Sequence, residues 1–149
     1  MTEGIETFRG VVFPWHCDVM GHMSVQHQMP LLDNAVYHLL GEFGPTVEVR
    51  HGERIGWADV KQQIHYLSEI LAGDLLVLRS GIIRAGRSSL THRTVIVRRS
   101  DGAVCTAMEG VTARYHLERR RSVPLTEQER ATAERLEAPQ NPVEASHDD

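Results

Sequence analysis

The segment from Leu32 to Phe43 places the strongest constraint on what this chain can fold into. Its apolar residues recur at positions i, i+3, i+4, i+7, i+8 and i+11, namely Leu32, Ala35, Val36, Leu39, Leu40 and Phe43. This spacing predicts a helix with a broad apolar face, and Gly44-Pro45 predicts its end. A helix that is apolar over so wide an arc must be covered by a second layer of secondary structure.

An antiparallel sheet is predicted to supply this layer. Runs of β-branched and alternating residues predict one strand before the helix and four after it, at Thr7–Phe13, Lys61–Leu71, Leu75–Ile83, Leu90–Arg99 and Val104–Leu117. Because short turns separate the last four strands, we expect them to form a meander. Residues 46–58 show no clear period and are predicted to be a loop with a short helical turn. The expected fold is α+β, with a five-stranded antiparallel sheet wrapped around one central helix, which is the hotdog arrangement.

The C-terminal part is expected to lie outside this arrangement. Thr126 and Glu129 fit a capping box, which predicts a polar surface helix from about Glu127 to Ala138. The remaining residues are polar and predict a disordered tail. The expected organisation is therefore a hotdog domain over residues 1–125, a C-terminal helix over residues 126–139 and a disordered tail over residues 140–149.

Composition excludes several classes of function. With 149 residues, the chain has room for a single domain. Its net charge is -4 and its only basic cluster, Arg119–Arg121, is short, so a nucleic-acid partner is not expected. No apolar stretch approaches the roughly 20 residues that cross a bilayer, and the acidic N-terminus does not resemble a secretion signal. Two cysteines give no disulfide framework, and we expect a cytoplasmic protein with no membrane partner.

The loop before the predicted helix carries the most informative pattern. In Trp15–Met23 an aspartate, Asp18, is followed three residues later by Gly21 and then by the start of the helix. This segment resembles the signature of the 4-hydroxybenzoyl-CoA thioesterase-like hotdog family. The resemblance extends over roughly residues 6–125, because later turns and strands follow in the same order as in the family.

The resemblance implies an enzyme that hydrolyses an acyl-coenzyme A thioester to a free acid and coenzyme A. Asp18 matches the family's catalytic carboxylate, which acts as nucleophile or general base. Val25 matches the residue whose backbone N–H polarises the thioester carbonyl, and Gly21 shapes the loop. His22 and Ser24 are candidate helpers at the same site. Neither a metal nor a redox cofactor is implied, since coenzyme A enters as part of the substrate.

Elementary chemistry supports these roles. The first turn of a helix leaves backbone N–H groups without partners, and the helix dipole favours negative charge there. A carboxylate at that position can attack, or activate water, while the N–H groups hold the oxyanion that forms. Two residues depart from the family pattern, because Ser24 stands where Asn is common and Gln28 where an aromatic residue is common. They predict a more polar pocket mouth and a short or polar acyl group. Pro30 is compatible with the helix only within its first turn.

The resemblance also implies contacts to coenzyme A and a partner. Arg84, Arg87 and Ser88 surround a turn that lies near the coenzyme A nucleotide in relatives, and guanidinium groups suit phosphate. Ordinary solvated turn residues are an equally good interpretation of the three. The family pairs as dimers with joined sheets and the active site at the seam, so a homodimer or homotetramer is expected.

Other interpretations of the same residues stay open. A cluster of His, Cys and Asp residues in the loop could bind a metal such as zinc, although its spacing fits no common ligand pattern. Cys17 could be a nucleophile or a small buried side chain. A hotdog hydratase or dehydratase would use Asp18 and His22 as an acid–base pair, and a non-catalytic acyl-CoA-binding protein would only retain the fold. Glu69 is a candidate second carboxylate or, more commonly, a solvated strand residue.

Overall fold

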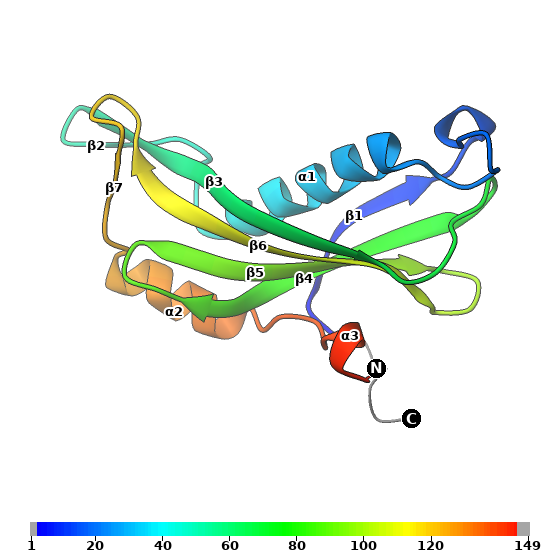
Figure 1. The fold of residues 1–149 in the computed structure, drawn as a ribbon. Coiled ribbons are helices and arrows are strands. Elements are labelled where there is room, and N and C mark those ends of the chain that lie inside the picture. The colour runs from blue at the N-terminus through cyan, green and yellow to red at the C-terminus, as the bar shows by residue number, and fades with distance from the viewer. Residues whose placement is uncertain (1–2, 146–149) are drawn as a thin grey trace.

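The computed structural model describes residues 3–145 of the chain. A curled antiparallel sheet wraps one long helix, and two short helices follow at the C-terminal end (Figure 1). In chain order the elements are β1 (Ile5–Val11), the 3-10 turn η1 (Pro14–His16), α1 (Val25–Gly41), β2 (Glu48–Arg50), β3 (Glu53–Tyr66), β4 (Leu75–Ala85), β5 (Ser89–Arg98), β6 (Val104–His116), β7 (Arg121–Ser122), α2 (Glu127–Arg135) and α3 (Pro142–Ala145).

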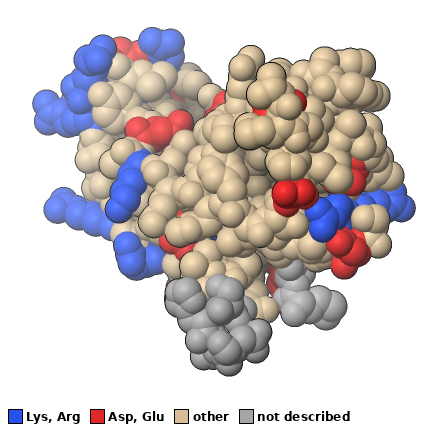
Figure 2. Space-filling view, turned by 45° about the vertical axis from the view of Figure 1, so that its right-hand side comes forward, with Lys and Arg blue, Asp and Glu red and all other residues tan. Residues whose placement is uncertain are grey.

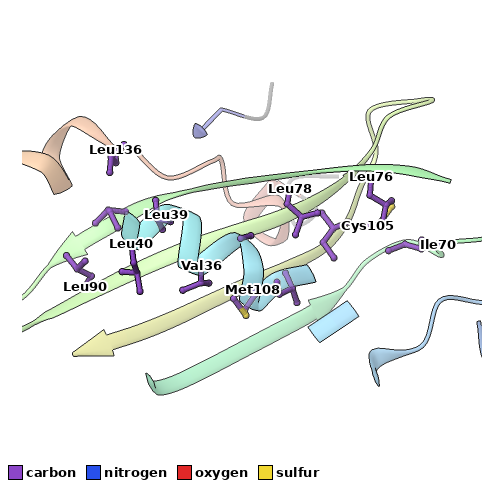
Figure 3. Close-up of a cluster of buried hydrophobic side chains, with 14 of the residues drawn as sticks. Val36, Leu39, Leu40, Ile70, Leu76, Leu78, Leu90, Cys105, Met108 and Leu136 are labelled. Carbon is purple, nitrogen blue, oxygen red and sulfur yellow. The ribbon is translucent and has the colours of Figure 1, made fainter. Parts of the chain in front are cut away.

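The predicted apolar stripe is the buried face of α1. Its buried residues include Leu32, Ala35, Val36, Leu39 and Leu40. These side chains pack against the inner face of the sheet, with Leu78, Leu90, Ile96 and Met108 in the same cluster (Figure 3). Burial of a large aliphatic side chain contributes about 1.5–3 kcal/mol, so this cluster is the main stabilising contact between the helix and the sheet.

The sheet is larger than predicted. It has seven strands in the order β1-β4-β5-β6-β3-β2, with β7 paired to β6, so the expectation of five strands is wrong. The two additional strands are short: β2 pairs with the start of β3, and β7 pairs with the end of β6. Neither carries enough residues to show an alternating pattern in the sequence.

The expected four-strand meander is also wrong in part. β4, β5 and β6 are consecutive neighbours, but β3 pairs with β6 and not with β4, whose other edge is occupied by β1. The chain therefore crosses the end of the sheet between β3 and β4. The connection consists of residues 67–74, a longer and more structured segment than the tight turn that the sequence predicts.

Strand β3 differs most from its predicted range. It begins at Glu53, inside the segment predicted to be a loop, and ends at Tyr66 rather than Leu71. A bulge at Val60 interrupts the alternation, since Asp59 pairs with Thr112 and Lys61 with Val111. Beyond the short pairing with β2, the edge of β3 away from β6 pairs with no strand among residues 3–145.

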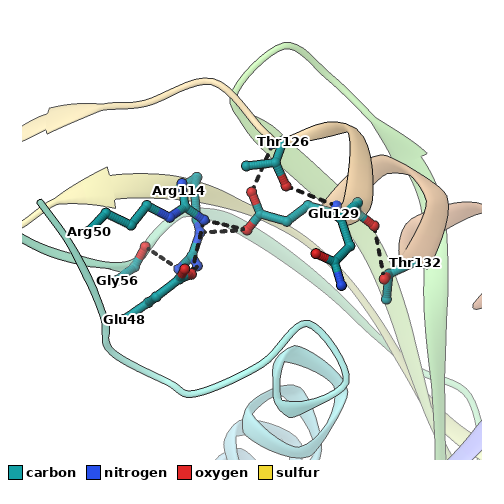
Figure 4. A network of polar contacts seen from close by, with 8 residues as sticks. Glu48, Arg50, Gly56, Arg114, Thr126, Glu129 and Thr132 are labelled. Carbon is teal, nitrogen blue, oxygen red and sulfur yellow. Dashed lines mark hydrogen bonds and ion pairs between the residues drawn. The ribbon is translucent and has the colours of Figure 1, made fainter.

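A buried ion-pair network attaches α2 to the sheet. The Arg114 guanidinium on β6 donates to Glu129 on α2 at 2.8 Å and to Glu48 on β2 at 3.0 Å (Figure 4). Arg114 is 1% exposed and Glu129 5%, and burial lowers the pKa of Arg114. The capping box is present, because Glu129 N donates to Thr126 Oγ1 and Thr126 N to Glu129 Oε1. The predicted surface helix thus has one face buried against the sheet.

The segment after α2 continues the sheet edge, which explains why the helix is shorter than predicted. α2 ends at Arg135, because Leu136 and Ala138 form backbone hydrogen bonds with Ile82 on β4. Gly81 permits this contact, since a Cβ atom there would lie 2.1 Å from Glu137 O. Within the predicted tail, residues 142–145 form α3, and residues 146–149 lie outside the described residues.

Helix apolarity and surface charge are the two properties to compare with the membrane and nucleic-acid partners that were not expected from the sequence. None of the helices among residues 3–145 is long and apolar enough to cross a membrane. On the face in Figure 2, basic side chains gather toward one side with acidic side chains among them, and the middle of the face is largely uncharged.

Candidate active site

The Asp18 loop is a compact turn held by its own aspartate. Asp18 Oδ1 accepts hydrogen bonds from the backbone N–H of Met20 at 2.9 Å and of His22 at 3.4 Å. Gly21 has φ +81°, a left-handed conformation that favours glycine. No donor among residues 3–145 binds Asp18 Oδ2. One carboxylate oxygen therefore fixes the loop, and the other accepts no hydrogen bond from these residues.

Helix α1 begins directly after this loop. Ser24 is the N-cap residue, but its side chain makes no capping hydrogen bond. The N–H groups of His27 and Gln28 both donate to Ser24 O. The N–H groups of Val25 and Gln26 donate to no acceptor within residues 3–145, as expected for the first turn of a helix. Pro30 lies beyond the first turn of α1, whereas from the sequence a proline was expected to be compatible with the helix only within that turn.

Asp18, His22 and Val25 line one hollow of about 330 Å³. This hollow opens between the Asp18 loop, the start of α1 and the segment that follows β3. Its remaining lining residues are Met23, Gln28, Tyr66, Leu67, Ser68, Glu69 and Ile70. The structure thus brings together Asp18, Val25 and the candidate helper His22, three of the residues that the sequence predicts for the site. Gly21 and Ser24 shape the loop and the helix start without lining the hollow.

Residues 67–71 form the second wall and are firmly anchored. The N–H groups of Leu67 and Ser68 donate to Cys105 O, and Leu71 N donates to Asp74 Oδ2 at 2.8 Å. Arg98 Nη1 on β5 donates to Glu69 O at 2.6 Å. The Asp101 carboxylate binds the same guanidinium through Nε and Nη2 and raises the pKa of Arg98. Sequence reasoning missed Arg98, because nothing near it in the chain marks a site.

Glu69 belongs to this wall and not to a strand, which corrects its predicted place. Its carboxylate lies 3.4 Å from His22 Nε2, and the Glu69 side chain is 68% exposed. A polar contact so exposed contributes little stability. It does place a second carboxylate and an imidazole in the same hollow as Asp18.

Gln28 is a fixed polar residue at the base of the hollow. The side chain is 6% exposed. Its Nε2 donates to Met23 O at 3.2 Å, and its Oε1 accepts from Thr106 Oγ1 at 2.7 Å. These bonds satisfy a buried amide that would otherwise be costly and hold it in one orientation.

The predicted coenzyme A contacts lie elsewhere in the same chain. Arg84 lines a different hollow, shared with Lys61 and Arg93. Arg87 and Ser88 lie in the β4–β5 hairpin, and the next residue, Ser89, pairs with Ala113 on β6. Tyr66, which lines the Asp18 hollow, pairs with Thr106 on the same strand. Seven residues of strand correspond to roughly 23 Å. One chain therefore does not bring these three residues to Asp18.

The loop histidines and cysteine make other contacts. His16 Nδ1 accepts from Phe13 N at 3.0 Å, and its ring lies 5.1 Å from that of His27. Cys17 is half-buried, with its Sγ 4.0 Å from Phe13 O. Within residues 3–145 there is no group of three His, Cys, Asp or Glu side chains placed to hold a metal ion.

A family model described as the thioesterase-like superfamily matches residues 12–134. The chain belongs to this superfamily. The match spans the loop, α1, strands β2 to β7 and most of α2, which confirms the resemblance to hotdog thioesterases. No curated protein matches the chain significantly.

Solved structures share the fold at low sequence identity. The protein SAV2348 from Staphylococcus aureus, in complex with CoA, aligns with TM-score 0.76 and 16% identity over 89% of this chain and 84% of its own. A predicted thioesterase from Bacillus stearothermophilus aligns with TM-score 0.72 and 19% identity over 89% and 98%. Slr0204, a 1,4-dihydroxy-2-naphthoyl-CoA thioesterase from Synechocystis, aligns with TM-score 0.69 and 14% identity over 85% and 93%. At these identities the likeness establishes the hotdog fold alone.

Proposed function

We propose that this member of the thioesterase-like superfamily hydrolyses an acyl-CoA thioester, with Asp18 as the reacting carboxylate. One observation carries the proposal: the free Oδ2 of Asp18 and the unpaired N–H of Val25 belong to the same hollow at the start of α1. The first supplies a nucleophile or base, and the second supplies a donor for the carbonyl oxygen.

The chemistry proceeds in two steps in the nucleophilic form. The Asp18 carboxylate attacks the thioester carbon, and the carbonyl oxygen takes up the charge beside the Val25 N–H. The C–S bond then breaks, and the coenzyme A thiolate leaves with the electron pair. Water cleaves the acyl–Asp18 anhydride to give the free acid. In the general-base form, Asp18 removes a proton from the water that attacks the thioester directly.

The acyl group is proposed to be short or polar. Gln28 presents a fixed amide group to the hollow, and the superfamily match alone does not define a substrate. Of the two Nε2 N–H groups, one donates to Met23 O, and a long alkyl chain would offer no acceptor to the other. Hydrolysis of short or hydroxylated acyl-CoA esters should therefore exceed that of long-chain esters.

A second copy of the chain is proposed to complete the site. Gly56 to Tyr66 present an unpaired strand edge, and sheet edges are usually protected. If β3 of one copy paired antiparallel with β3 of a second copy, Tyr66 of one strand would lie near Gly56 of the other. Such a homodimer, or a homotetramer built from it, would bring the β4–β5 hairpin of one copy toward the Asp18 hollow of the other. Arg84, Arg87 and Ser88 could then bind coenzyme A phosphates across the seam.

A panel of acyl-CoA esters tests the proposal, with release of free thiol as the measured signal. Asp18→Asn should lower turnover by several orders of magnitude while coenzyme A still binds. Glu42→Gln, which changes an exposed carboxylate beyond the other end of α1, should leave turnover unchanged. After a single turnover in ¹⁸O water, label in Asp18 would identify the nucleophilic form, because the label enters Asp18 only when water attacks the Asp18 carbonyl carbon of the anhydride.

If no ester is cleaved faster by the natural chain than by Asp18→Asn, the protein is not a thioesterase. Binding of coenzyme A without turnover would then identify a non-catalytic acyl-CoA-binding protein. Addition of water to an enoyl-CoA ester would identify a hydratase.

A further inference from the structure

The peptide unit between Glu69 and Ile70 is held from one side by Arg98. Glu69 O accepts from Arg98 Nη1 at 2.6 Å. The next carbonyl, Ile70 O, accepts from Met23 N of the Asp18 loop at 2.7 Å. Successive carbonyls therefore point to opposite sides, as in an extended chain.

This arrangement fixes the direction of the Ile70 N–H. The peptide bonds of residues 3–145 are all trans, and a trans peptide directs its N–H away from its C=O. Because Glu69 O points to Arg98, the Ile70 N–H points to the other side. That side carries Met23 and the wall of the hollow that Asp18, Val25 and Ile70 all line.

The Ile70 N–H is a buried donor without an acceptor. Ile70 belongs to the buried cluster drawn in Figure 3 and is 2% exposed, yet its N–H donates to no group among residues 3–145. In the same segment the N–H groups of Leu67, Ser68 and Leu71 have acceptors. The N–H of Glu69 has none among residues 3–145 either, but Glu69 is exposed, so Ile70 is the buried residue of the segment whose N–H is unpaired. Unpaired buried backbone donors are rare in folded proteins. A ligand oxygen is the partner that this geometry lacks.

We propose that the Ile70 N–H is a second donor to the substrate carbonyl oxygen, acting across the hollow from the Val25 N–H. This inference rests on the proposed thioester hydrolysis. When a carboxylate or water oxygen bonds to the thioester carbon, the carbonyl π pair moves onto oxygen, and both N–H groups hold that charge until the C–S bond breaks. Arg98 is a positioning residue, since it touches the peptide and not the substrate.

Replacing the amide at position 70 by an ester tests this donor. An α-hydroxy acid incorporated in place of Ile70 removes the N–H and keeps the side chain. Loss of one oxyanion donor costs on the order of 10²-fold in kcat, so we expect kcat to fall at least tenfold with KM nearly unchanged. The matched control is the ester at Leu71, whose N–H binds Asp74. An unchanged kcat for the position-70 ester, or an equal loss in both variants, would overturn the proposal.

A binding measurement separates this inference from the proposed hydrolysis. In ¹⁵N-labelled protein, an acyl-CoA analogue with CH₂ in place of sulfur should move the Ile70 amide proton downfield and leave that of Leu71 unmoved. If the natural chain hydrolyses no ester but Ile70 shifts in this way, the hydrolysis proposal fails and the donor assignment stands. If Ile70 does not shift on binding, the assignment is wrong.

Discussion

At the scale of single residues, His92 shows how burial controls protonation in this sheet. It lies under α1 at 1% exposure, and its Nε2 is 3.0 Å from Thr112 Oγ1. Its Nδ1 has no hydrogen-bond partner within residues 3–145. Burial lowers the pKa of His92 from 6.5 to about 4, against a smaller opposing effect of Asp59. The folded protein therefore holds the ring neutral.

This predicts a loss of stability in acid. Because the folded pKa is depressed, the stability contribution is complete above pH 6.5 and is lost as pH falls toward 4. At 1.36 kcal/mol per pKa unit, the free energy of unfolding should fall by about 3 kcal/mol across this window. Urea unfolding of the natural chain and of His92→Gln at several pH values measures it. Equal pH slopes for the two would show that His92 does not contribute.

Arg98 should control the order of the second wall of the site. Arg98→Met removes the hydrogen bond to Glu69 O, so amide exchange in residues 67–71 should accelerate and kcat should fall more than KM changes. Added guanidinium ion should restore part of kcat. Arg99→Met, which changes an exposed neighbour, serves as the control. If Arg98→Met and the natural chain show the same amide exchange in residues 67–71 and the same kcat, Arg98 does not position this wall.

Some residues of the candidate site could be predicted from the sequence, and others could not. Asp18, Gly21 and Val25 stand within one local motif at the start of a strongly periodic helix, so the family resemblance predicts them together. Ile70 joins the hollow, and Arg98 contacts the wall of the hollow from the other side, through tertiary contacts alone. A main-chain donor also carries no side-chain signal, because any residue at position 70 would supply the same N–H.

At the scale of elements, the Arg114–Glu129 pair joins α2 to the sheet. Arg114→Met leaves the Glu129 carboxylate buried without its main partner, and breaking such a pair costs about 3–5 kcal/mol. Arg54 and Glu118 form a matched exposed pair at 2.7 Å, for which Arg54→Met should cost less than about 1 kcal/mol. Chemical denaturation compares the two variants. Similar losses would show that burial does not distinguish these pairs.

Gly81 should be required for docking of the segment after α2. In Gly81→Ala the new Cβ would clash with Glu137 O, so the strand-like contact at Ile82 should open at a cost of roughly 1–3 kcal/mol. Faster amide exchange at Ile82 and Ala138 reports the opening. Gly41→Ala, in open space at the end of α1, should be neutral or stabilising. If amide exchange at Ile82 is unchanged in Gly81→Ala, the backbone has shifted to accommodate the methyl group, and the segment after α2 has kept its hydrogen bonds to Ile82.

Elements with strong local periodicity were predictable, and elements defined by distant pairing were not. The stripe of α1 follows from spacing alone, as do the β4, β5 and β6 strands between their short turns. The start of β3 has no such period, because its pairing with β2 and β6 and the bulge at Val60 interrupt the alternation. The neighbour of β3 was mispredicted because the connection through residues 67–74 does not act as a hairpin.

At the scale of the whole molecule, the open edge of β3 predicts self-association. Val60 is 64% exposed on this edge and Val49 is 67% exposed on β2. Val60→Asp should dissociate a dimer held by paired β3 strands, because two added carboxylates would face each other near its centre. Val49→Asp should leave the dimer intact. Sedimentation velocity measures the mass, with 16.8 kDa expected for one chain. A natural chain that sediments as a monomer would contradict a dimer of paired β3 strands. The same mass for Val60→Asp and Val49→Asp would contradict it as well.

The contact between Met23 N and Ile70 O has a consequence for how the molecule acquires activity during folding. It joins two walls through residues that are 47 positions apart (70 − 23) in the chain, and the second wall is attached to Cys105 near the start of β6. Contacts of such sequence separation form slowly, because loop-closure entropy is paid before they are made. The helix can form early from local interactions, but the hollow beside Asp18 is complete only after β3 has paired with β6. Catalytic competence should thus be among the last properties recovered on refolding, later than helical circular dichroism.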